Sequence, residues 1–264
     1  YEGMKYTVAE SYRNLIACNI NPLAITNNLN FASPLDPNIM GELVLSIDGL
    51  KTAAEKFNTP IVSGNVSLYN QTNEIPIKPT PVIGMVGSNQ DLKKINSNKF
   101  CNIGNKILVL GKQLEKNLSP YLLQDQNLAS NINEYNDLEE LDLDYEKKVA
   151  DCVLKMSDFK YIMSCNDISR GGVFLSLLKM QYKDMGFKVN IPDPIDLFCE
   201  YSAGYVIEIR NENLNNVTSF LSKNGVGYFE IGEIIKENIE INSKKFDYFD
   251  IINNYHNNFE KIIN

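Results

Sequence analysis

Apolar residues recur at three- and four-residue steps through much of the chain, a spacing that places them along one face of a helix. In residues 4–18 this face consists of Val8, Tyr12, Leu15 and Ile16. A second helix is expected to begin at Pro37, with Asp36 as its N-terminal cap. The same spacing predicts further helices over residues 144–159, 171–185, 211–225 and 247–263.

Short apolar runs between these helices predict β-strands. The predicted strands cover residues 22–26, 60–64, 80–87, 106–111, 161–169, 204–209 and 226–234. The run TPVIGMVG (80–87) is apolar nearly throughout, so we expect it to be buried on both faces of a sheet. Residues 27–37 are polar and contain two prolines, which predicts a loop. Strands that alternate with helices indicate an α/β fold made of α+β layers.

The length of 264 residues suits one or two domains. We expect a first α/β domain over residues 1–100 and a second over residues 101–264. The polar, acidic stretch 119–144 is typical of an insertion or a linker. The chain starts with Tyr1 and not with Met, so we expect it to be a piece of a longer protein.

The net charge of -8 disfavours nucleic acid as a main partner, because phosphate binding needs clustered Lys and Arg. An acidic protein that handles a phosphorylated ligand needs a divalent cation to offset the repulsion. No stretch approaches the roughly 20 apolar residues of a membrane span, and no signal peptide is visible. The five scattered cysteines fit reduced thiols, so we expect a cytoplasmic protein without a membrane partner. The only histidine, His256, lies in a polar tail, and we expect it to be exposed.

The segment SGNVSLYN follows a predicted strand and contains no acid, base or nucleophile pair. Period-two alternation places Asn65, Ser67 and Tyr69 on one side and turns Val66 and Leu68 toward the core. These polar groups, with the backbone at Gly64, suit a site for a charged ligand. The alternative is a bulge or turn whose amides and hydroxyls satisfy the backbone.

Two other polar segments have similar alternatives. Asn27, Asn28 and Asn30 could place polar groups at the same sheet edge as Asn65, or simply belong to an asparagine-rich loop. The segment NDISRGGVF (166–174) suits an anion-binding helix N-terminus, or tight packing of a helix on a strand. Its Asp167 is either a metal ligand or a helix cap.

Together, four segments resemble the phosphoribosylformylglycinamidine synthase family, in its larger subunit. Residues 8–40 (VAESYRNLIACNINPLAITNNLNFASPLDPNIM) and 59–87 (TPIVSGNVSLYNQTNEIPIKPTPVIGMVG) are similar to two long motifs of that family. NDISRGGV (166–173) resembles its HD-SDGGL motif, and LFCEYSAGYVIEI (197–209) resembles its LF-ES-GR motif. The resemblance covers about residues 1–235 and implies that this chain corresponds to the C-terminal half of the enzyme.

This resemblance implies a pair of aminoimidazole-ribonucleotide-synthetase-like domains, the first of them incomplete. It also implies an ATP-dependent ligase of purine biosynthesis, which converts formylglycinamide ribonucleotide and glutamine-derived ammonia to formylglycinamidine ribonucleotide. By the same resemblance, Asn27 and Gly64 contact ATP, Asn65 is a Mg²⁺ ligand and Ser67 contacts the substrate. The implied partners are the missing N-terminal half, a glutaminase subunit and a small bridging subunit.

The chain departs from the family pattern in ways that matter for activity. Asn27 stands where the family has an aspartate, Asn166 where it has a histidine, and Tyr205 where it has an arginine. The family's catalytic histidine belongs to the preceding half, so we expect no catalytic residue in this chain and no turnover by it alone. One alternative is a non-catalytic half that holds the complex together. Another is a different ATP-dependent member of the superfamily, which would need Asp-rich metal loops or a catalytic Cys or Lys.

Overall fold

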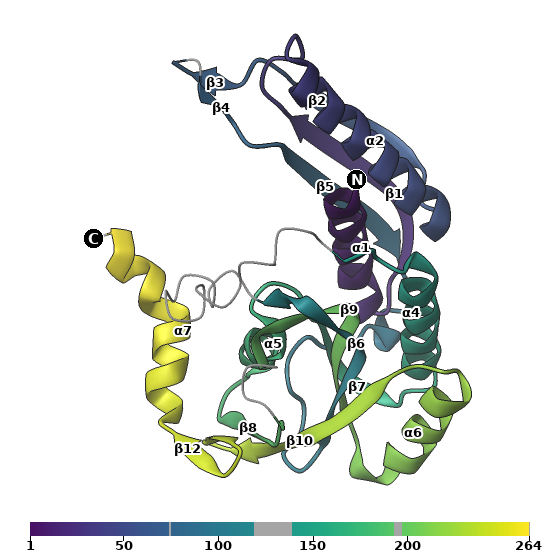
Figure 1. The fold of residues 1–264 in the computed structure, drawn as a ribbon. Helices are drawn as coiled ribbons and strands as arrows, with labels where there is room; N and C mark the ends of the chain where they lie inside the picture. Colours follow the sequence, from purple (N-terminus) through teal and green to yellow (C-terminus); the bar gives the residue numbers. More distant parts are fainter. Residues whose placement is uncertain (74, 119–138, 193–196, 264) are drawn as a thin grey trace.

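Two larger β-sheets form the framework of the chain (Figure 1). The computed structural model describes residues 1–73, 75–118, 139–192 and 197–263. The first sheet has three strands in the order β2-β1-β5, and the second has seven in the order β12-β11-β8-β10-β6-β9-β7. A small hairpin pairs β3 (Gln71–Thr72) with β4 (Ile75–Pro76). Within the described residues no helix is both long and apolar enough to cross a membrane.

The three-stranded sheet and two helices make up the N-terminal part. Its main elements are α1 (Glu2–Ala17), β1 (Asn21–Asn30), α2 (Pro37–Phe57), β2 (Ile61–Ser67) and β5 (Thr80–Ser88). β1 pairs in parallel with β2 and antiparallel with β5. The predicted start of α2 is confirmed, since the Asp36 side chain accepts a hydrogen bond of 2.8 Å from Asn38 N. The helix predicted over 4–18 is confirmed as α1, one to two residues earlier.

The seven-stranded sheet carries the C-terminal part, after the short η1 (Leu92–Lys94). Its elements are β6 (Lys106–Leu118), α4 (Leu143–Asp158), β7 (Ile162–Asp167), α5 (Gly172–Met180), β8 (Met185–Val189), β9 (Cys199–Ile209), η4 (Asn211–Asn213), α6 (Leu214–Lys223), β10 (Tyr228–Lys236), β11 (Ile239–Ile241), β12 (Lys244–Phe246) and α7 (Tyr248–Ile263). Residues 119–138 of the predicted insertion lie outside the described residues.

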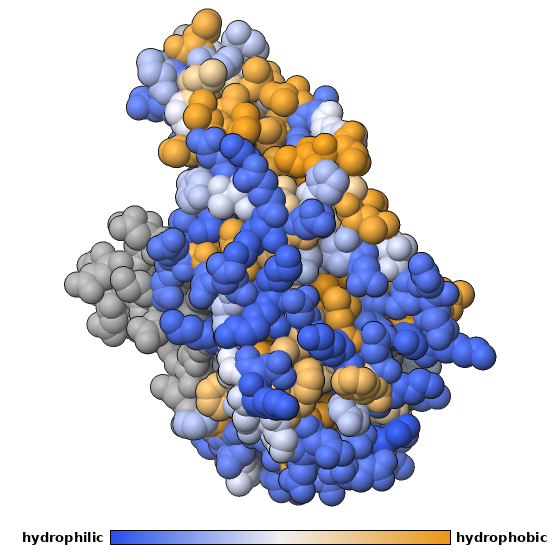
Figure 2. All heavy atoms as spheres, turned by 90° about the vertical axis from the view of Figure 1, so that its right-hand side faces the viewer, coloured by the Kyte–Doolittle hydropathy of each residue, from blue (hydrophilic) through white to orange (hydrophobic). Residues whose placement is uncertain are grey.

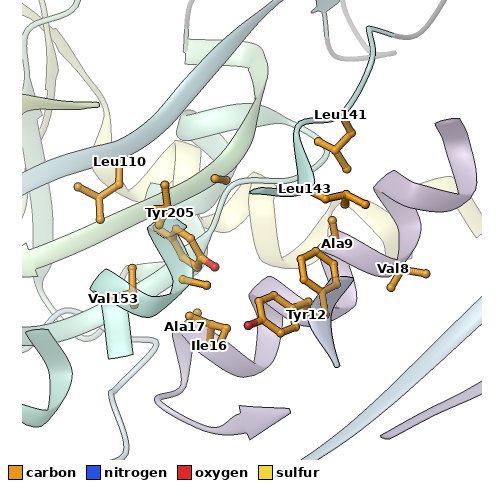
Figure 3. Close-up of a cluster of buried hydrophobic side chains, with 14 of the residues drawn as sticks. Val8, Ala9, Tyr12, Ile16, Ala17, Leu110, Leu141, Leu143, Val153 and Tyr205 are labelled. Atoms are coloured by element: carbon orange, nitrogen blue, oxygen red, sulfur yellow. The ribbon is translucent and has the colours of Figure 1, made fainter. Parts of the chain in front are cut away.

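One hydrophobic core connects the two parts of the chain. It combines buried side chains of α1, α2 and β1 with those of α4 and β9. Tyr12 of α1 stacks on Phe57 of α2, with ring centroids 4.1 Å apart. Figure 3 shows that the side chains of α1, including Tyr12 and Ile16, lie in the same cluster as Tyr205 of β9. The N-terminal helix is therefore a structural component of both parts.

A buried ion pair strengthens this junction. Arg13 Nη1 of α1 lies 2.7 Å from Glu146 Oε1 of α4, and both side chains are buried. The same Glu146 oxygen accepts a hydrogen bond from Ala203 N of β9 at 2.7 Å. Burial alone would lower the pKa of Arg13, but the neighbouring groups Glu146, Tyr205 and Asp167, with Glu146 the largest contributor, together offset this and raise the pKa. Burial, and next the charge of Glu146, raise the pKa of Tyr205 well above its ordinary value.

A second buried carboxylate organises the segment at the expected domain boundary. Glu208 accepts hydrogen bonds from Cys101 N at 2.8 Å and Asn102 N at 3.0 Å. It also accepts from Asn105 Nδ2 and Ser164 Oγ, each at 2.6 Å. Because four donors converge on one carboxylate, residues 101–105 are held against the β7 and β9 strands.

Several predicted boundaries are wrong. β1 continues to Asn30, so residues 27–30 form a strand and not the predicted loop. β9 begins at Cys199, five residues before the predicted strand, and α5 ends at Met180 instead of continuing to 185. The extra strand length arises from pairing with neighbouring strands, a tertiary effect that outweighs the low strand propensity of asparagine.

Burial of the three-stranded sheet also differs from the expectation. Val82 and Val86 of β5 are 52% and 57% exposed, so the run 80–87 is not buried on both faces. Among the described residues, α1 and α2 cover the other face of this sheet. Figure 2 shows that apolar surface gathers over the part of the molecule that carries this sheet and α2. Exposed apolar side chains there include Met40, Val44, Leu45, Ile47, Ile61 and Val62.

Candidate functional site

The predicted site residues lie on β1 and β2, whose strands run parallel and adjacent. Ile25 and Leu29 of β1 are buried in the core with α1 and α2, which defines the helix-covered face of the sheet. Since side chains alternate along a strand, Asn27 shares that face and Asn28 lies on the other. We call this other face the open face. Its side chains are Thr26, Asn28, Asn30, Ser63, Asn65, Ser67, Val82 and Val86.

Asn27 and Gly64 meet on the helix-covered face. They are direct partners across the β1–β2 pair. A Cβ atom added at Gly64 would lie 2.5 Å from Asn27 Oδ1, so no side chain fits there while the Asn27 carboxamide keeps its place. The close approach explains why residue 64 is glycine, and it brings together the two residues predicted to contact ATP.

Asn65 lies on the open face beside Asn28, one of the three asparagines that were expected near the same sheet edge. Asn65 Nδ2 donates a hydrogen bond of 3.2 Å to Asn28 Oδ1 on the neighbouring strand. Two residues earlier on each strand, Thr26 Oγ1 and Ser63 Oγ share a hydrogen bond of 2.8 Å. Asn65 Oδ1 accepts no hydrogen bond from the described residues, and Asn65 is exposed. The open face therefore presents a free amide oxygen next to two hydroxyls.

Ser67 ends β2 and takes part in a tight turn with Asn70. Asn70 Nδ2 donates to Ser67 O at 2.9 Å and to Phe31 O at 3.0 Å, while Ser67 Oγ lies 3.2 Å from Asn70 Oδ1. Tyr69 adopts a left-handed conformation, with φ of 61°, so the predicted alternation stops before it. Asn70 was missed as the organiser of this turn, although its position at the end of SGNVSLYN is a common turn signal.

The prediction that Val66 is directed into the core is wrong. Val66 shares the side of its register partner Leu29, but it is 52% exposed. The reason is that β2 is an edge strand, and the helices cover the sheet less completely at this edge. Leu68, the other predicted core residue, does pack against the core.

At the third predicted segment, packing explains the two glycines. Gly171 and Gly172 have φ values of 89° and 66° at the start of α5. A Cβ at Gly172 would lie 2.5 Å from Leu197 O, so the helix approaches the backbone before β9 closely. Asp167 is buried; its backbone oxygen accepts from Ser176 Oγ at 2.8 Å, and its Oδ2 has no partner in the described residues. Close to this segment, burial and the charge of Glu10 raise the pKa of Glu200.

The donors on the open face fit part of a Mg²⁺ site. Mg²⁺ prefers oxygen ligands, keeps several waters, and is commonly held by one or two protein groups together with phosphates. Asn65 Oδ1 offers such an oxygen at an exposed position. Within the described ranges no group of three or more His, Cys, Asp or Glu side chains could hold a metal by itself. His256, exposed on α7 as predicted, takes no part in the open face.

The chain belongs to the AIR synthase related protein family. The model of that family's N-terminal domain matches residues 1–88, and the model of its C-terminal domain matches residues 102–243. These matches confirm the predicted α/β fold class.

Among curated proteins, the chain is similar to the phosphoribosylformylglycinamidine synthase subunit PurL, which confirms the predicted resemblance. It is 38% identical to PurL of Pelagibacter ubique over 267 residues, which covers 97% of this chain and 35% of that protein. It is 32% identical to PurL of Petrotoga mobilis over 272 residues, which covers 100% of this chain and 37% of that protein. The chain therefore spans little more than a third of the length of these relatives.

Solved structures show the same fold at low sequence identity. Thermotoga maritima PurL complexed with FGAR matches with a TM-score of 0.73 and 15% identity, over 96% of this chain and 43% of that one. Escherichia coli HypE, a hydrogenase maturation protein, matches with a TM-score of 0.69 and 13% identity, over 92% of this chain and 78% of that one. The fold is thus shared by proteins with different names and roles. The function must therefore be inferred from the residues of the site and not from the fold.

Proposed function

We propose that the chain forms the C-terminal part of a phosphoribosylformylglycinamidine synthase, and that its open face contributes one wall of the active site. The reaction would consume ATP, formylglycinamide ribonucleotide and glutamine-derived ammonia, and give formylglycinamidine ribonucleotide, ADP and phosphate. The observation that carries the proposal is the exposed Asn65 on the open face, whose amide oxygen accepts no hydrogen bond from the described residues, in a segment that resembles the PurL motif.

Each predicted residue has a role in this proposal that suits its position. Asn65 would hold Mg²⁺ through Oδ1, and Ser67 at the end of the same strand would contact the substrate. Asn27 and Gly64 would contact ATP from the helix-covered face, so a nucleotide held by all four residues would have to cross the edge strand β2. Bound Mg²⁺ would offset the phosphate charge that an acidic protein otherwise repels. Catalysis then depends mainly on positioning and on charge stabilisation.

The rest of the active site would come from other parts of a longer protein. The chain spans little more than a third of PurL, and the open face exposes Val82 and Val86, which are typical of a face that is covered in an assembly. We propose that the preceding half of the enzyme covers these valines and supplies the proton-transferring groups. One Thermotoga maritima structure is of a PurLQS complex, and the corresponding partners here would be a glutaminase subunit and a small bridging subunit.

The decisive test is the Asn65→Ala variant of the full-length protein that carries this chain. We expect Mg²⁺-dependent nucleotide binding, measured by titration calorimetry, to weaken by about tenfold or more. Amidine formation from ATP and ammonia should fall with it. Asn216→Ala is the matched control, because Asn216 is an exposed asparagine on α6, far from β2 in the sequence. Unchanged nucleotide binding and unchanged turnover in Asn65→Ala would overturn the proposal, as would amidine formation by this chain alone.

A second candidate function is a non-catalytic half that stabilises the assembly. Two contacts favour it: the Asn27 carboxamide packs on Gly64, and the Ser67 hydroxyl hydrogen-bonds with Asn70. Both side chains therefore stabilise the local structure. The same titration separates the candidates. Lost nucleotide binding with full turnover would show that this site holds nucleotide without taking part in the reaction.

A further inference from the structure

The Asn28–Asn65 pair on the open face has a consequence for the chemistry of Asn65. A carboxamide carries an acceptor oxygen and a donor NH₂ group in nearly the same shape, and a half-turn about the last side-chain bond exchanges them. Only the oxygen can bind a metal cation. Asn65 can thus bind a metal cation at a given position in only one of its two orientations. A neighbouring group that favours this orientation would raise the affinity for the metal.

The neighbouring strand provides the selection. Asn65 Nδ2 donates to Asn28 Oδ1 at 3.2 Å, and in the opposite orientation Asn65 Oδ1 would face the Asn28 oxygen. Two acceptors facing each other repel, so as long as the Asn28 oxygen faces Asn65 the pair favours the orientation with Asn65 Oδ1 directed away from Asn28. The two residues are register partners in the parallel β1–β2 pair, which fixes their backbones relative to each other.

The backbone of Asn28 is held in place by the strands around it. It belongs to the central strand of the sheet and is also the register partner of Val82 on β5. Two pairs along, Thr26 and Ser63 make their own hydrogen bond on the open face. The polar pairs form a ladder that follows the register of the two strands.

We propose that Asn28 is the positioning residue for the metal-binding oxygen of Asn65. This inference rests on the proposed function, because it assigns Asn28 a role through a metal ligand. Asn28 does not touch the metal; it acts by holding the NH₂ group of Asn65. Residues that orient metal ligands in this way typically change metal affinity by about 10–100-fold when they are lost. The exposed position of the pair places the expected effect at the low end, about tenfold.

The test measures Mn²⁺ binding to the full-length protein by the loss of the free Mn²⁺ EPR signal, without added nucleotide, because ADP would itself bind Mn²⁺. Asn28→Ala should weaken Mn²⁺ binding about tenfold. Asn28→Asp keeps an acceptor in the same place, so it should retain the affinity of the parent protein. Asn21→Ala, at the other end of β1, is the control for an asparagine substitution in the same strand, and it should have no effect.

A double variant separates orientation from general damage to the strand. A carboxylate presents acceptor oxygens in both orientations, so Asn65→Asp no longer needs to be oriented by Asn28. In the Asn65→Asp background, Asn28→Ala should therefore leave Mn²⁺ affinity unchanged. In the parent background, KM for Mg²⁺ should rise with kcat retained at saturating Mg²⁺, and the unfolding midpoint should stay constant.

The outcomes distinguish this inference from the proposed function. If Asn65→Ala leaves Mn²⁺ affinity unchanged, the metal role of Asn65 is wrong and the inference fails with it. If Asn65→Ala weakens binding but Asn28→Ala does not, only the positioning role is refuted. An equal loss from Asn28→Ala in both backgrounds would also refute it, because the effect would then not depend on the amide orientation.

Discussion

Arg13→Met is the most informative perturbation of the junction between the two parts of the chain. The variant removes the cation but keeps much of the apolar stem, so the packing of α1 changes little. It leaves Glu146, which is 0% exposed, without its charged partner. We therefore expect a large loss of stability from a single substitution.

The magnitude follows from the geometry of the pair. At the 2.7 Å separation of Arg13 Nη1 and Glu146 Oε1, the attraction is about 6 kcal/mol with an effective dielectric constant of about 20. The desolvation of both ions offsets part of it, and measured costs of removing one partner of a buried pair are about 3–5 kcal/mol. Glu146 still accepts from Ala203 N, so we expect about 3 kcal/mol.

Urea unfolding of the chain, followed by far-UV circular dichroism because the chain has no tryptophan, measures this loss. Arg210→Met, at an exposed arginine, is the matched control and should stay within about 0.5 kcal/mol of the parent. Adding Glu146→Gln to Arg13→Met should recover most of the stability, because a neutral amide oxygen still accepts from Ala203 N. The reasoning is refuted if Arg13→Met costs no more than the control, or if the double variant is no more stable than Arg13→Met.

Two further predictions concern other buried groups. Glu208→Gln should lower the free energy of unfolding by about 1–3 kcal/mol, since its new NH₂ would face donors, whereas the exposed Glu212→Gln should be neutral in the same urea assay. Burial raises the pKa of Tyr12 to about 12, so the folded state holds this proton more tightly than the unfolded state does. The stability from this shift is present below about pH 10 and is lost as the pH rises toward 12. Urea midpoints at pH 8 and pH 11 test the sign, and an equal or higher midpoint at pH 11 would contradict it.

The sequence was sufficient for α1 and for the start of α2 because their signals are local. The start of α2 was predictable from Asp36 and Pro37, since a cap and a proline at the first turn act within a few residues. The spacing of Val8, Tyr12 and Ile16 located the buried face of α1 for the same reason. These signals depend on no contact with a distant segment.

The candidate site was harder to predict because it depends on pairing between distant strands. The asparagines after Thr26 have low strand propensity, so the run was assigned to a loop, and only pairing with β2 and β5 makes it a strand. Once Asn30 is placed at the end of β1, alternation separates Asn27 from Asn28 and puts Asn28 beside Asn65. The prediction that Asn65 lies on a polar side of its strand is confirmed by its exposure. Its hydrogen-bond partner, Asn28, could be identified only from the register of β1 and β2.

The open face itself is divided, and the division bears on how a longer protein would use it. Toward β5 it presents Val82 and Val86, while toward β2 it presents the hydrogen-bonded pairs that end at Asn65. Covering the valines removes apolar surface from water, whereas covering the polar pairs would strip water from a free amide oxygen. We therefore expect an assembly to cover the β5 side and leave the β2 side accessible to ligand. In the opposite case, Asn65→Ala would alter the stability of the assembly and leave its affinity for metal unchanged.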